Sequence, residues 1–167
     1  MVRPRIILCT LTIFFLLHAK GYTNINQLVG VELTEAVLVQ MPTNDYSSPQ
    51  MTLLSFERAL HCGDFTNMYN CCTAECNYED LQVSNIAEVA QSIIDGVRLA
   101  ATNAIHSIID SVDVRLDTDT RYKAVVRYRE LKNGFTGYER MRYDVKKIDV
   151  LWKLDEWIDL LPGEDED

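Results

Sequence analysis

Residues 59–64 read Ala-Leu-His-Cys-Gly-Asp (ALHCGD), and this short stretch separates two helical patterns. Before it, apolar residues recur at helical spacing over residues 51–60, and after it Phe65 and Met68 resume the pattern. Asp64 is a natural helix N-cap, because its carboxylate can accept the free backbone amides of the next turn. The sequence therefore predicts two helices that meet at a Gly-Asp corner.

Four of the five cysteines lie in and after this corner, namely Cys62, Cys71, Cys72 and Cys76. In an oxidising compartment an even set of cysteines forms disulfides by default. A bridge between adjacent cysteines is strained, which leaves Cys62–Cys71 with Cys72–Cys76, or Cys62–Cys72 with Cys71–Cys76. A metal site is the alternative, but this spacing lacks the paired C-x2-C of structural zinc sites. We expect disulfides and no metal.

A third helix is expected from Ser84, and beyond Ala104 the apolar repeat changes from about 3.6 residues to 2, which is typical of strands. The predicted strands cover residues 108–116, 121–129, 139–145 and 150–158. Turns are expected at residues 117–120 and at Asn133-Gly134. Helices followed by strands predict an α+β domain, with three N-terminal helices packed on a curved antiparallel sheet of about four to six strands.

This order of parts resembles the nuclear transport factor 2-like superfamily, the cone-shaped, cystatin-like fold shared with ketosteroid isomerase. The matching stretches are ALHCGD at residues 59–64, the helix from Ser84, and the Trp-x-Leu-x-x-Trp-Ile stretch at residues 152–158. In particular, the chain is similar to small secreted nematode members of this superfamily. The resemblance covers about residues 51–161 and implies a pocket between sheet and helices that is open at one end.

In many relatives such a pocket binds or transforms a small apolar molecule, and in others the sheet face forms a dimer. The residues expected to line the pocket lie on one helix and on the inward sides of the strands: Phe56, Val112, Tyr122, Val126, Tyr128, Met141, Tyr143 and Trp152.

Isomerase-like relatives use a pocket aspartate as general base. Here the alternation places Asp110 on the apolar side of its strand, where burial would raise its pKa as a general base requires. Tyr128 and Tyr143 are candidate hydrogen-bond donors. The alternative is a bulge near Ser107 or Ser111 that turns Asp110 to solvent. No catalytic motif of the superfamily matches residue by residue.

Two further groups of polar residues have weaker patterns. His61, His106, Asp117 and Asp119 lack the spacing of metal ligands, so we expect no metal and no cofactor. Arg127, Arg129, Arg140 and Arg142 alternate on the outward side of two strands, where they could receive an acidic partner or the GEDED tail of a second copy. The alternative is a solvated face balanced by Asp113, Asp144 and Asp155.

The N-terminus has the layout of a secretory signal peptide, with Arg3 and Arg5 before an apolar run at residues 6–17. A membrane-spanning helix needs about 20 apolar residues, more than this run holds. We expect a signal peptide at residues 1–21, a flexible leader at 22–50, the superfamily domain at 51–161 and an acidic tail at 162–167.

The expected mature chain has thirteen Lys and Arg against twenty-five Asp and Glu, so its formal charge is −12, which argues against nucleic-acid or anionic-membrane binding. We expect a secreted, extracellular and non-enzymatic protein that binds a small apolar ligand or a protein partner. An isomerase or dehydratase that uses Asp110 is one alternative. A dimerising structural module is the other.

Overall fold

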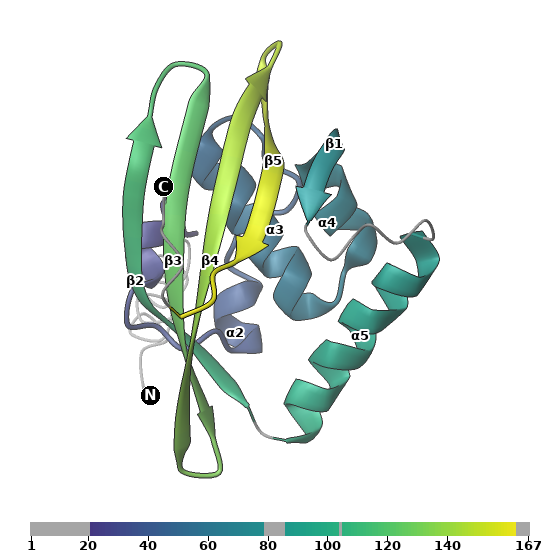
Figure 1. Ribbon diagram of the computed structural model, residues 1–167, viewed down its shortest axis with the longest axis vertical. Coiled ribbons are helices and arrows are strands. Elements are labelled where there is room, and N and C mark those ends of the chain that lie inside the picture. Colours follow the sequence, from purple (N-terminus) through teal and green to yellow (C-terminus); the bar gives the residue numbers. More distant parts are fainter. Residues whose placement is uncertain (1–20, 79–85, 104, 163–167) are drawn as a thin grey trace, which may run out of the picture.

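The computed structural model describes residues 21–78, 86–103 and 105–162, which form one sheet with helices on one side (Figure 1). The elements in chain order are the 3₁₀ helix η1 (Ile25–Leu28), α2 (Glu35–Leu38), α3 (Pro49–Cys62), α4 (Phe65–Cys71), β1 (Cys72–Tyr78), α5 (Ile86–Thr102), β2 (His106–Asp117), β3 (Arg121–Lys132), β4 (Phe135–Ile148) and β5 (Leu151–Asp159). The expected signal peptide up to residue 20, the helix start at Ser84 and the acidic tail from residue 163 lie outside the described residues. Among those described, no helix is long and apolar enough to cross a membrane.

The α+β class is confirmed, and the sheet has five strands in the order β1-β5-β4-β3-β2. Strands β2 to β5 form the expected antiparallel meander, but β1 pairs with β5 in parallel, so the sheet is mixed and the prediction of a purely antiparallel sheet is wrong. Cys72 pairs with Leu154 and Asn77 pairs with Glu156. Five residues of β1 thus lie along only two residues of β5. Such a bulge breaks the two-residue alternation by which a strand is recognised in sequence.

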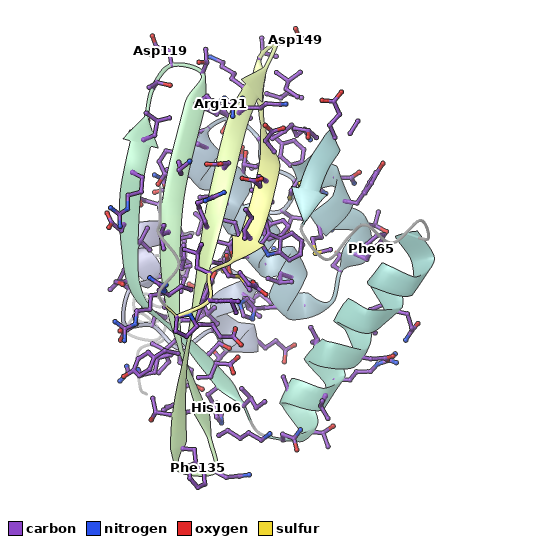
Figure 2. All side chains as sticks on the ribbon, viewed as in Figure 1. Phe65, His106, Asp119, Arg121, Phe135 and Asp149 are labelled. Atoms are coloured by element: carbon purple, nitrogen blue, oxygen red, sulfur yellow. The ribbon has the colours of Figure 1, made fainter. Side chains whose placement is uncertain are left out.

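Tight turns join the long strands where the sequence placed them. Asn133 and Gly134 both have positive φ, 49° and 84°, as the two central residues of a type I′ hairpin turn require. Thr118 closes the β2–β3 turn, its hydroxyl oxygen accepting from the backbone N–H of Arg121 at 3.0 Å. Figure 2 shows Phe135 at one end of the sheet and Asp119 and Asp149 at the other.

The helix-corner-helix expected around ALHCGD is present. Gly63 has a φ of 64° and ends α3, while the carboxylate of Asp64 accepts from the backbone N–H of Asn67 at 3.1 Å and starts α4. A left-handed residue at this position favours glycine. α3 packs against the sheet, and α5 packs against α3 and α4, clear of the strands (Figure 1).

The segment over residues 22–50 is not a loose leader. Ile25 and Leu28 on η1 are fully buried in the core. The backbone N–H of Gly30 donates to the carbonyl of Ile109 at 2.7 Å, and that of Leu33 donates to the carbonyl of Ser107 at 2.9 Å. The sequence suggested a flexible leader because the apolar residues of this segment are few and mixed with polar ones. In the fold these apolar residues cover the β2 side of the core.

Candidate functional site

The eight residues expected to line a pocket lie together on the inner side of the sheet and on α3. Six of them are buried, and Val112 and Met141 are partly buried against the same core. The ring of Phe56 meets Trp157 edge-on at 4.8 Å and Tyr143 at 5.9 Å between centroids. These side chains therefore pack as core, and the cavity described below is lined by other residues.

Asp110 does not point into this core, so its proposed role as general base is corrected. The β2–β3 register shifts between Ile109 and Ser111, and Ile109 takes the inward position with no exposed surface. The carboxylate of Asp110 lies on the outward face, 3.7 Å from Arg127 and 3.8 Å from Arg129. A bulge reverses the side on which the following residue lies, which is the alternative considered above.

The buried carboxylate of this protein is Glu57, on α3. Its side chain is completely buried, and the hydroxyl of Tyr128 donates a short hydrogen bond to its Oε1. The hydroxyls of Tyr128 and Tyr143 lie 3.0 Å apart and hydrogen-bond to each other, and the Tyr143 hydroxyl also lies 3.2 Å from the Sδ of Met141. Tyr143, Tyr128 and Glu57 thus form a hydrogen-bonded chain inside an apolar core, where an isolated carboxylate would be costly.

Burial raises the pKa of Tyr128 well above its ordinary value, and the neighbouring carboxylate of Glu57 raises it further. The pKa of Tyr143 is raised for the same two reasons in the same order. A raised pKa keeps a phenol protonated to higher pH. Both tyrosines are consequently hydrogen-bond donors throughout the physiological range.

The sequence contains a signal for Glu57 that we did not use. Leu53, Glu57 and Leu60 are spaced by four and three residues, so Glu57 lies on the same face of α3 as two apolar residues. A charged residue in the middle of an apolar helix face indicates a buried polar partner on another element. Which element supplies it is visible only in the fold.

His61, one turn after Glu57, joins this chain to a cavity. Its Nε2 lies 3.5 Å from Glu57 Oε2, and within the described part of the chain neither atom has a hydrogen-bond partner. On its other side the residue borders a cavity of about 420 Å³ between α2, α3, α5 and the start of β2. The cavity, here called the His61 cavity, is lined by Leu33, Glu35, Leu38, His61, Cys62, Val97, Ala100, Ile105 and Ser107.

A second carboxylate lies within electrostatic range of His61. Burial raises the pKa of Glu139 on β4, and the neighbouring Glu130 and Asp159 raise it further. His61 lowers the pKa of Glu139. His61 therefore interacts with the carboxylates of both Glu57 and Glu139.

The arginine ladder on the outward face is matched by acids of the same chain. Arg142 is 2.7 Å from Glu156, and Arg127 and Arg129 flank Asp110. Two of the expected counter-charges pair with lysines instead, Asp144 with Lys123 at 3.7 Å and Asp155 with Lys146 at 2.5 Å, and Asp113 lies 3.0 Å from Arg115. An acidic partner, or a second copy, would have to compete with these pairs.

The residues considered as metal ligands are spread over the molecule. His106, at the start of β2, contacts Glu32. Asp117 is the last residue of β2, and Asp119 lies in the turn after it, at the far end of the strand (Figure 2). Among the described residues no group of His, Cys, Asp and Glu side chains could hold a metal ion.

The thiols of Cys62, Cys71, Cys72 and Cys76 are free in the structure, and those of Cys72 and Cys76 interact. The β1 bulge brings Cys72 and Asn77 level with two β5 residues that are two positions apart, about 7 Å along the strand. Cys76 directly precedes Asn77, and the shortened path brings it closer to Cys72 than a regular strand would. The thiol of Cys76 is also the largest cause of a raised pKa at Cys72, ahead of burial.

The other two thiols have different surroundings. The Cys71 thiol is buried and interacts with Tyr46, whereas Cys62 is exposed at the end of α3. The pairing of the four cysteines into two bridges stays a prediction.

No protein-family model matches the sequence, and no curated protein is significantly similar to it. A nuclear transport factor 2-like protein with a cystatin-like fold from Novosphingobium aromaticivorans has a TM-score of 0.48 at 12% identity over 68% of this chain and 79% of its own. The association domain of C. elegans CaMKII has a TM-score of 0.49 at 16% identity over 65% and 89%. The beta subunit of benzoate 1,2-dioxygenase from Burkholderia mallei has a TM-score of 0.41 at 14% identity over 74% and 94%.

Proteins described as nuclear transport factor 2-like are among the solved structures that match this chain. Identities this low concern the arrangement of helices and strands alone. The finer resemblance to small secreted nematode members is not tested by these structures.

Proposed function

We propose that the protein binds a small, largely apolar molecule in the His61 cavity. The observation that carries the proposal is the cavity itself: about 420 Å³, with apolar walls from α2, α5 and the residue before β2, and one imidazole backed by a buried carboxylate. Ligand sites are commonly concave and mostly apolar, with a few polar groups that orient the ligand. The cavity lies beside the core, whereas the sequence resemblance implied a pocket enclosed by the sheet and the helices.

Filling the cavity should abolish this binding. Ala100 lines the cavity on α5, whereas its neighbour Leu99 is mostly exposed and does not. In a titration with n-octanol followed by two-dimensional amide NMR, we expect shifts around Ala100, Val97 and Leu38. Ala100→Trp should weaken octanol binding at least tenfold, about 1.4 kcal/mol, and Leu99→Trp should not. Equal affinities for both variants and the parent protein would exclude the cavity as the site.

We also propose that the protein is exported and that its bridge joins Cys72 and Cys76. The basic and apolar N-terminus supports export, and the β1 bulge supports the pairing. Secreted from a eukaryotic host, the unreduced chain should start at Tyr22 and have a mass about two hydrogens below that of the reduced chain. Cys76→Ser should remove this difference, and Cys62→Ser should not. A deficit of four hydrogens would instead show two bridges and contradict the single bridge that we propose.

A further inference from the structure

The His61 cavity has one carboxylate in its lining, that of Glu35. His61 and Cys62 also line it, and Glu57 and Glu139 interact with His61 without lining the cavity themselves. None of its lining residues is a lysine or an arginine. The lining therefore offers a ligand the carboxylate of Glu35 as a hydrogen-bond acceptor.

Several basic residues of the fold have partners of their own outside the cavity. Arg58, on the same helix as Glu57, donates from Nη1 to the carbonyl of Met41 at 2.8 Å. Arg98, on α5, lies 3.5 Å from Asp95. On the sheet, Lys123, Arg127, Arg142 and Lys146 pair with acids of the same chain.

One oxygen of Glu57 adds a specific indication. The carboxylate is completely buried, and its Oε2, which faces the cavity residue His61, accepts no hydrogen bond from the described residues. A buried carboxylate oxygen without a donor is uncommon, because the desolvation of the charge is then uncompensated. Glu57 does not itself line the cavity, and its Oε2 lies behind His61, 3.5 Å from the Nε2 of that residue.

We propose that the ligand of the His61 cavity is an amphipathic amine, with an apolar body and a protonated amino group. This inference rests on the proposed function and names the chemical class of its ligand. The apolar body lies against Leu38, Val97 and Ile105, and the ammonium group faces the carboxylate of Glu35. An ammonium has three donors and no acceptor, which suits a carboxylate, and hydrogen bonds between charged groups are stronger than neutral ones. A carboxylate ligand would be repelled.

Three probes of equal chain length test the charge preference: n-octylamine, n-octanol and n-octanoate, titrated by calorimetry or amide NMR at low ionic strength, where charge effects are screened least. We expect octylamine to bind at least tenfold more tightly than octanol, and octanoate most weakly. Glu35→Gln should reduce the ratio of octylamine to octanol affinity severalfold and leave octanol unchanged. Glu32→Gln is the matched control, since Glu32 pairs with His106 and does not line the cavity.

The outcomes separate this inference from the proposed function. If octanol binds and octylamine binds no more tightly, or octanoate is preferred, the amine inference is wrong and the cavity remains a site for apolar ligands. An amine preference that survives Glu35→Gln but is lost in Glu32→Gln would place the amine outside the His61 cavity and overturn the inference. If no probe shifts the cavity residues, both the inference and the proposed function fail.

Discussion

Replacing Phe56 with alanine is expected to lower the free energy of unfolding by about 3–5 kcal/mol. Phe56 has no exposed surface, and its ring lies between Tyr143 on β4 and Trp157 on β5. Truncation removes the apolar contacts of the ring and leaves a cavity at the junction of α3 with two strands. Both terms add to the loss of stability, since the strands on either side cannot close the gap without breaking their pairing.

The measurement is urea unfolding followed by circular dichroism, with the loss read from the midpoint at unchanged slope. Phe135→Ala is the matched control, because Phe135 is 80% exposed at the end of the β3–β4 hairpin (Figure 2). It should change the unfolding free energy by less than about 0.5 kcal/mol. A loss below about 1 kcal/mol for Phe56→Ala would show that α3 does not pack on the sheet as described.

Replacing Tyr128 with phenylalanine is expected to cost about 2–3 kcal/mol, more than the loss of an ordinary hydrogen bond. The substitution keeps the ring but removes the donor to a completely buried carboxylate, so Glu57 loses its described hydrogen bond. Tyr122→Phe is the control: its hydroxyl accepts from Nε2 of Gln50 at 2.6 Å, an uncharged pair, and its loss should cost about 1 kcal/mol.

A double-mutant cycle isolates the interaction between the two groups. In the background of Glu57→Leu, Tyr128→Phe should cost far less than in the parent protein, because the carboxylate that needed the donor is gone. The coupling free energy should be about 1–3 kcal/mol. Additive effects in urea unfolding would mean that the short contact between Tyr128 and Glu57 does not stabilise the folded state.

A buried carboxylate such as that of Glu57 often stabilises a core less well than an apolar residue does, which argues that Glu57 has a role beyond stability. Apolar residues of similar volume often stabilise a core as well as a buried ionic network does or better. Here the carboxylate is held by Tyr128 and Tyr143 on one side and lies beside His61 on the other, next to a cavity. Buried titratable groups grouped at a cavity are typical of functional sites.

Much of the fold could be predicted from local sequence. Helix spacing, the Asp64 cap and the left-handed Gly63 together define the corner between α3 and α4, because each depends only on residues a few positions away. The same holds for the two-residue repeat of β2 to β5 and for the Asn133-Gly134 turn, whose positive φ values suit few other residues. The inward positions of Tyr122, Tyr128 and Tyr143 follow from that repeat.

The candidate site was decided by tertiary structure. One bulge in β2 turned Asp110 outward and Ile109 inward, and alternation alone does not reveal a bulge. Glu57 and Tyr128 are 71 positions apart, so no local pattern shows that a donor meets the carboxylate.

The same holds for the burial of η1 and the parallel pairing of β1 with β5. Each depends on which distant segment occupies the neighbouring space. Local sequence determined the elements and most of their faces, whereas only packing between distant elements determined which polar groups were enclosed and where a cavity remained.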